Sequence, residues 1–206
     1  MPQLVISANG QQRLPIVGNN PCRCSVLPFR YAASIGYNIP YMLTGSFASS
    51  VYGMGRGSPD LDFILDADEA KITRLLDQLP ENGFYSELNH ALEACRQNST
   101  FNMVDSVTGL KVDFILLKRG AFSQEEFRRR RKVPVWKTSL YIATPEDIVV
   151  SKLEWEKLGK SSRQIEDVAG VLKVQKEKLD LPYIEKWVRE LGLAPQWAQA
   201  RRACWS

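Results

Sequence analysis

The chain has 206 residues, of which 44% are hydrophobic and 24% charged, and its formal net charge is +4. This composition is ordinary for a soluble globular protein, so it excludes a wholly disordered chain and leads us to expect one domain with an appendage. The mild basic excess suits a phosphate-bearing substrate.

Cysteine usage and hydropathy exclude two further classes of protein. The four cysteines have neither the paired spacing of a zinc site nor the density of a disulfide scaffold, so we expect a reducing, cytoplasmic environment. No apolar run approaches the ~20 residues that span a bilayer, and the first residues lack the layout of a signal peptide. We therefore expect neither membrane insertion nor export.

The first half of the chain alternates strand and helix signals. Residues 1–30 show no sustained hydrophobic period, and we interpret them as an N-terminal arm of uncertain structure. From residue 41, "YMLT" predicts a short strand, "SFASSVYG" one or two helical turns, and "LDFILD" a buried strand. Residues 68–83 predict a helix, because their apolar residues recur at the spacing of one helical face behind an acidic first turn.

The next segment predicts a hairpin and then a run of helices. Residues 100–120 contain two β-type runs joined by a turn-forming stretch, and residues 138–143 predict another strand. Thr144 and Pro145 have the residue types of a helix cap and first helical position. Beyond them, glycines and prolines divide the chain into three or four predicted helices.

These elements predict an α/β (α+β) fold in which a mixed sheet is flanked by helices and followed by a helical region. The predicted organisation has three parts: an N-terminal arm (1–30), a catalytic domain (31–143) and a C-terminal helical region (144–206). The basic run "FRRRRK", residues 127–132, is either a solvated helix end or a patch that meets polyanions.

The stretch "TGSFASSVYGMGRGSPDLDFILD", residues 44–66, holds the first candidate site. Its glycines do not form a phosphate loop of the Walker type, since no lysine follows them, nor a dinucleotide-binding turn, since they precede a strand. Asp60 and Asp62 lie two apart in a predicted strand, so their side chains share one face of the sheet. Alternatively, Asp60 caps a turn and Asp62 faces solvent.

A third carboxylate favours a metal site. Asp113 lies in "KVDFILL", a strand-like apolar run in which a buried carboxylate is costly unless it is paired or metal-bound. Carboxylate oxygens together with substrate phosphates are the ligands that Mg²⁺ usually takes. We therefore expect Asp60, Asp62 and Asp113 to bind Mg²⁺.

Three residues of the same stretch are candidates for nucleotide binding. Gly45 and Ser46 begin a predicted helix, whose free N–H groups and positive dipole end attract anions. Ser46 is alternatively a simple helix cap. Arg56, between two glycines, either contacts a triphosphate or is a solvated loop residue.

Together, the Gly-Ser pair, the Asp-x-Asp strand and the later strand aspartate resemble the DNA polymerase beta-like nucleotidyltransferase superfamily. The context "YMLTGSFASSVYGMGRGSPDLDFIL" looks especially like the bacterial minimal nucleotidyltransferases and their AbiEii-type relatives. The resemblance covers about residues 38 to 193, and in its helical segment the matching positions are Lys152, Arg163 and Asp167.

The resemblance implies an enzyme with two Mg²⁺ ions, or Mn²⁺ in their place. It would move a nucleoside monophosphate from a nucleoside triphosphate (ATP among them) to a hydroxyl acceptor. Asp60 and Asp62 would hold both metals, Asp113 would complete one shell and take the acceptor's proton, and Lys152 would meet the triphosphate. The acceptor would be a partner protein, a tRNA end or a small molecule, in some relatives within a toxin–antitoxin system.

Plainer interpretations stay open for several of these residues. Lys152 is alternatively a surface lysine, and Arg163 and Asp167, four apart, are alternatively a helix ion pair. We expect His90 to be a surface or loop residue. We expect packing rather than base stacking from the tryptophans of the C-terminal helices, namely Trp155, Trp187, Trp197 and Trp205.

Two other functions compete with the enzyme. A non-catalytic nucleotide-binding or antitoxin interaction module would keep the fold but transfer nothing, although all three carboxylates are present. A DNA-binding protein using Arg128 to Lys132 would show a steep salt dependence. The oligomeric state is not determined by the sequence.

Overall fold

The computed structural model describes residues 39–53, 60–78, 83–106, 109–135, 138–159 and 161–205. Its strands are β1 (Tyr41–Thr44), β2 (Asp60–Leu65), β3 (Phe84–Tyr85), β4 (Thr100–Asp105), β5 (Lys111–Leu116), β6 (Arg131–Val135) and β7 (Thr138–Ile142). Its helices are α2 (Gly45–Tyr52), α3 (Glu69–Asp77), α4 (Leu88–Gln97), α5 (Ala121–Arg129), α6 (Pro145–Gly159), α7 (Ser162–Gln175), η2 (Lys176–Lys178), α8 (Leu181–Glu190) and α9 (Ala194–Trp205). The predicted N-terminal arm lies outside the described residues.

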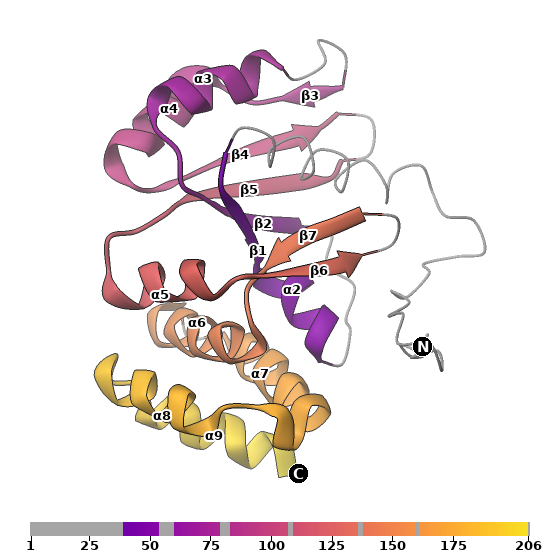
Figure 1. Cartoon of the computed structure of the whole chain (residues 1–206), viewed down its shortest axis with the longest axis vertical. Coiled ribbons are helices and arrows are strands. Elements are labelled where there is room, and N and C mark those ends of the chain that lie inside the picture. Colours follow the sequence, from indigo (N-terminus) through magenta and orange to yellow (C-terminus); the bar gives the residue numbers. More distant parts are fainter. Residues whose placement is uncertain are drawn as a thin grey trace, which may run out of the picture.

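The described strands form one mixed sheet in the order β3-β4-β5-β2-β1-β7-β6. Strands β2 and β5 pair in parallel, as do β1 and β7, whereas the remaining neighbours are antiparallel. In Figure 1, α3 and α4 lie beside the β3–β4 end of the sheet, and α6 to α9 lie beyond its other end. The predicted mixed α/β sheet flanked by helices is confirmed.

Local sequence explains where several elements begin. The Asp68 carboxylate accepts a hydrogen bond from the Lys71 N–H at 2.8 Å and caps α3, the helix predicted over residues 68–83. The Asp147 N–H donates to Thr144 Oγ1 at 3.3 Å, so Thr144 caps α6 as expected and Pro145 is its first residue. The predicted hairpin is the β4–β5 pair.

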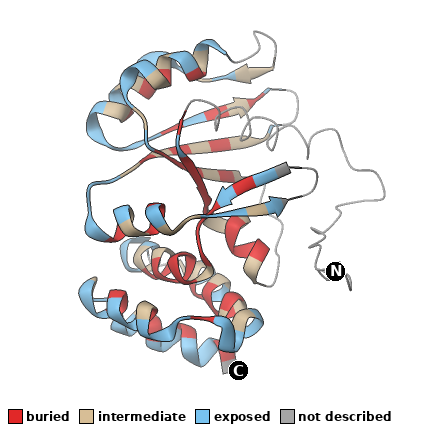
Figure 2. Cartoon of the chain, viewed as in Figure 1, coloured by how far each residue is buried: buried red, intermediate tan, exposed pale blue. Residues whose placement is uncertain are grey.

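The core joins the sheet to the C-terminal helices. Phe101 and Phe114 of neighbouring strands stack with ring centroids 5.1 Å apart, and both are buried. Buried residues in Figure 2 run along β1 and β2 and on to the inner faces of α2, α6 and α7. Trp187 and Trp197, which belong to α8 and α9, are buried in the same apolar cluster, as predicted.

Some sequence-based expectations were incomplete or wrong. Helices α4 and α5 and strands β3 and β6 were not predicted. Trp155 is 59% exposed and therefore does not pack in the core, contrary to expectation, while the Trp205 side chain lies outside the described residues. His90 is exposed on α4, as expected. Among the described helices, none is long and apolar enough to cross a membrane.

The basic run is neither wholly a helix end nor wholly solvated. Arg128 is mostly exposed in the last turn of α5 and pairs with Glu125 at 2.7 Å, which fits the helix-end interpretation. Arg129 is instead 22% exposed and paired with acidic residues of α6, and β6 begins at Arg131. The polyanion interpretation stays a prediction.

Candidate functional site

Two neighbouring parallel strands bring the predicted carboxylates together. Asp62 of β2 and Asp113 of β5 are direct register partners, and Asp60 is the partner of Lys111. Since residues two apart share a face of a sheet, all four side chains leave the same face at the same end of these strands. A sequence separation of about fifty residues is therefore reduced to one strand spacing of ~4.8 Å.

Asp62 lies at the centre of this charge cluster. Burial, the neighbouring Asp113 and, to a smaller extent, Asp60 raise the pKa of Asp62 to about 6, against the opposing effects of Lys152 and of a backbone hydrogen bond from Ser46. A carboxyl that is desolvated beside like charges is stabilised by a cation, because the cation offsets both effects. This environment suits a metal ligand.

Gly45 brings the start of α2 against the Asp62 carboxylate. Its φ is +67°, and a Cβ built on it would lie 1.9 Å from Asp62 Oδ2. Only glycine combines this left-handed backbone with so close an approach. The Thr44 side chain makes no cap hydrogen bond, and the first turn of α2 contains no acidic residue. The Ser46 N–H at the start of α2 donates to the Asp62 carboxylate, so that carboxylate lies at the positive end of the helix dipole.

Lys152 reaches this helix start from α6. Its Nζ donates to Ser46 Oγ at 3.1 Å and to Asp167 Oδ2 at 2.6 Å, and the lysine side chain is 6% exposed. The surface-lysine interpretation is therefore wrong. Asp167, on α7, pairs with Lys152, and not with Arg163 as the helix-pair interpretation has it; Arg163 is exposed.

Lys111 is a site residue that the sequence interpretation missed. Its Nζ lies 2.8 Å from Asp113 Oδ1 and 3.0 Å from Asp113 Oδ2. Among the described residues, no three carboxylate, imidazole or thiolate groups converge closely enough to hold a metal ion. The signal was present in "KVD", because a lysine two residues before a strand aspartate must share its face.

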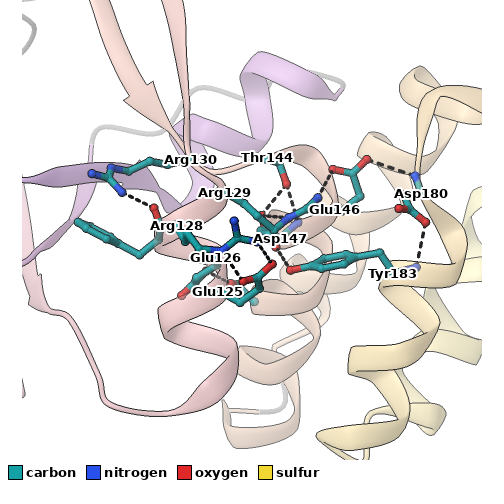
Figure 3. A network of polar contacts seen from close by, with 12 residues as sticks. Glu125, Glu126, Arg128, Arg129, Arg130, Thr144, Glu146, Asp147, Asp180 and Tyr183 are labelled. Atoms are coloured by element: carbon teal, nitrogen blue, oxygen red, sulfur yellow. Dashed lines mark hydrogen bonds and ion pairs between the residues drawn. The ribbon is translucent and has the colours of Figure 1, made fainter.

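A buried polar network, shown in Figure 3, fixes the first turn of the helix that carries Lys152. Asp147 is fully buried and accepts hydrogen bonds from Thr144 Oγ1 at 2.6 Å, Tyr183 Oη at 2.6 Å and Arg129 Nε at 3.2 Å. The Arg129 guanidinium also lies 3.8 Å from the Tyr183 ring centroid. The network ties α5, α6 and α8 into one unit, because each contributes a partner.

A second buried acid, Glu126 of α5, contacts Ser151 of α6. It is 4% exposed and accepts a hydrogen bond from Ser151 Oγ at 2.8 Å. Burial raises the pKa of Glu126 to about 8, although the Ser151 hydrogen bond lowers it. Neutral Glu126 therefore belongs to the helix packing rather than to the carboxylate cluster.

The structure thus brings together most of the predicted site. Asp60, Asp62 and Asp113 lie on two adjacent strands, and Gly45 with Ser46 lies against Asp62. Lys152 joins the same site through Ser46, whereas Arg56 lies outside the described residues.

Comparison with known proteins supports the fold assignment. Searches of the sequence against protein-family models and curated proteins give no match. Among solved structures, the antibiotic-resistance factor ANT(2'')-Ia superposes with a TM-score of 0.53 at 11% identity, covering 86% of this chain and 95% of its own. The chain has the nucleotidyltransferase fold. A second protein with this fold is an antigenic nucleotidyltransferase-like protein from Paracoccidioides brasiliensis, with a TM-score of 0.50, 15% identity and coverage of 87% and 92%.

The resemblance seen in the sequence is confirmed at the level of this fold. The more specific likeness to AbiEii-type toxin–antitoxin relatives stays a prediction. Within the nucleotidyltransferase fold, the aspartates of β2 and β5 and the N-terminus of α2 form the candidate site.

Proposed function

We propose that the chain is a Mg²⁺-dependent nucleotidyltransferase that moves a nucleoside monophosphate from a nucleoside triphosphate to a hydroxyl acceptor. The observation that supports this most is the position of Gly45. Its missing Cβ lets the N-terminus of α2 meet Asp62, so a helix end that attracts anions and a candidate metal ligand share one place. A nucleoside triphosphate with its divalent ion needs both.

The donor set fits magnesium by its chemistry. Three carboxylates on one face of adjacent strands supply hard oxygen ligands, and Asp62 and Asp113 are direct register partners. The fit requires the Asp113 carboxylate to leave Lys111. Two Mg²⁺ ions, or Mn²⁺ in their place, would be held by Asp60 and Asp62 with Asp113 completing one shell. When bound, they neutralise the charge that develops on the attacking and leaving oxygens.

The nucleotide would lie over the start of α2. The Ser46 hydroxyl would donate to phosphate oxygens, the positive dipole end of the helix would attract them, and Gly45 keeps the approach unobstructed. Lys152 is already within hydrogen-bond distance of Ser46 Oγ and adds a positive charge at the same place. Arg56, in the segment that precedes β2 in the sequence, is a further proposed phosphate contact.

The transfer step needs a proton acceptor, which we assign to Asp113. The acceptor's hydroxyl oxygen forms a bond to the α-phosphorus while the bond to the pyrophosphate oxygen breaks. Pyrophosphate leaves, and the hydroxyl proton passes to the Asp113 carboxylate. Asp113 suits this role because 19% of its side chain is exposed, so an acceptor can reach it.

The acceptor is proposed as a partner protein, a tRNA end or a small molecule, and the reaction as part of a toxin–antitoxin system. These alternatives are separated by incubating the protein and Mg²⁺ with each α-labelled nucleoside triphosphate in a cell lysate. Label is then sought in protein, RNA and small-molecule fractions. The Asp60→Ala, Asp62→Ala double variant should transfer none, whereas Asp77→Asn, an exposed aspartate at the end of α3, should transfer normally.

A non-catalytic nucleotide-binding module is the second candidate, favoured by one observation. Asp113 is paired with Lys111, and the described carboxylates do not converge closely enough to hold a metal ion as they lie. Such a module would bind Mg²⁺ and ATP, as followed by calorimetry, but would label no fraction of the lysate. Labelling that depends on Asp62 excludes it.

A further inference from the structure

Lys111 makes a direct charged contact with Asp113, one of the candidate metal ligands. Its ammonium group lies 2.8 Å from one oxygen of Asp113 and 3.0 Å from the other, so it approaches both. The lysine side chain is 43% exposed and the Asp113 side chain 19% exposed. The pair is therefore within reach of ions from solvent.

The register places Lys111 among all three carboxylates. It is the direct partner of Asp60 across β2 and β5 and lies two residues before Asp113 on the same face. Its charge is also attracted by Asp60 and Asp62. A positive charge here reduces the mutual repulsion of the carboxylates, as a bound divalent ion would.

We propose that Lys111 is an internal counter-cation that competes with the divalent metal for Asp113. The inference rests on the proposed function, because it takes these carboxylates as the metal ligands. An ammonium group and a divalent ion at the same carboxylate repel each other, so metal binding displaces the Lys111 Nζ. The free ammonium then faces solvent or the phosphates of the incoming nucleotide.

This arrangement has a consequence for the reaction. While Lys111 holds Asp113, the carboxylate assigned as the proton acceptor is occupied at both oxygens. Arrival of the metal with its nucleotide releases it. Lys111 is thus a positioning residue that partly offsets the negative charge of the carboxylate cluster before metal binds. Its displacement by the metal frees the Asp113 carboxylate to accept a proton.

Metal affinity tests the competition without any acceptor. Mn²⁺ is titrated into the full chain, and the free ion is followed by electron paramagnetic resonance. Lys111→Met should bind Mn²⁺ about two- to five-fold more tightly than the wild type, the range that a partly exposed ion pair allows. Lys111→Arg, which keeps the charge, should bind as the wild type does.

Lys132→Met is the matched control. It removes the same charge from an exposed position on β6, four strands away from β5 in the sheet and beyond the ~10 Å screening length at 0.1 M salt. Its Mn²⁺ affinity should not change. Unchanged or weaker binding by a folded Lys111→Met variant overturns the proposal.

A second measurement uses the wild-type chain and does not depend on how a variant folds. Reductive methylation of Lys111, followed by mass spectrometry, should speed up when Mg²⁺ is added, whereas Lys132 should react at a constant rate. An unchanged rate at Lys111 under saturating Mg²⁺ contradicts displacement. If the wild type does not bind Mn²⁺, or if Asp62→Asn binds it equally well, the proposed function fails, and this inference fails with it. If the wild type binds Mn²⁺ at Asp62 but Lys111 does not compete, only the Lys111 proposal is overturned.

Discussion

Replacing Gly45 by alanine should disable the site through one contact. The added Cβ would lie 1.9 Å from Asp62 Oδ2, whereas ordinary contacts begin at 3.4 Å. The Asp62 carboxylate therefore has to move by about 1.5 Å, and displacements near 1 Å are enough to cost about 100-fold in rate. We expect nucleotide transfer to fall by about that factor and Mn²⁺ binding to weaken with it.

The same substitution also carries a backbone cost. A non-glycine residue at φ +67° costs about 1–2 kcal/mol, which corresponds to a fall in Tm of roughly 2–8 °C for a chain of this size. Gly109→Ala separates the two effects, because its φ is +71° and no atom lies within 4 Å of its added Cβ. Thermal unfolding should show a similar backbone cost in both variants.

Metal titration and label transfer then distinguish them. Gly109→Ala should bind Mn²⁺ and transfer label as the wild type does, whereas Gly45→Ala should be impaired in both. If Gly45→Ala keeps wild-type metal affinity and transfer, the close contact with Asp62 has no functional role, and our account of the start of α2 is refuted.

Three further changes test the surroundings of the site by chemical unfolding. The raised pKa of Glu126 means that the folded state keeps a proton that the unfolded state has lost, so this group's contribution to stability falls as pH rises from about 4.5 to about 8. Glu126→Gln should therefore gain up to roughly 5 kcal/mol over the wild type at pH 9 and little at pH 5, and a pH-independent difference would count against the buried-acid assignment. Lys152→Met removes the ammonium partner of the Asp167 carboxylate, which is 5% exposed, and should lower the free energy of unfolding by about 3–5 kcal/mol. Adding Asp167→Asn should restore part of this loss, and a loss below about 1 kcal/mol would contradict the buried pair. Tyr183→Phe removes a 2.6 Å hydrogen bond to fully buried Asp147 and should cost about 1–3 kcal/mol, whereas a neutral change would show that Arg129 and Thr144 suffice.

Local patterns in the sequence predicted the parts of the site that depend on neighbours along the chain. The shared face of Asp60 and Asp62 follows from the two-residue period of a strand, and the Thr144 cap follows from residue type. The apolar β-type residues around Asp113 likewise predicted a strand from local sequence alone. What these patterns predict is the element and its face, not its neighbour in the sheet.

The contacts that assemble the site join distant segments, which local patterns do not encode. The pairing of β2 with β5 sets Asp62 beside Asp113, and Lys152 meets a serine 106 residues earlier. The burial of Arg129 against Asp147 likewise depends on how α5 packs on α6, so "FRRRRK" alone could not show which arginine is buried. Lys111 is different, because its face was readable from "KVD".

The most direct test of the proposed function is pyrophosphate release during Mg²⁺-dependent labelling of the acceptor fraction identified in lysate. The wild type and Asp77→Asn should release pyrophosphate in step with label transfer, and removing Mg²⁺ with a chelator should stop both. Asp62→Asn keeps the shape of the side chain but removes its charge, and it should lower the rate by about 100- to 1000-fold, the range seen when one group that stabilises transition-state charge is removed. An Asp62→Asn variant that transfers label at the wild-type rate would show that these carboxylates do not carry the reaction.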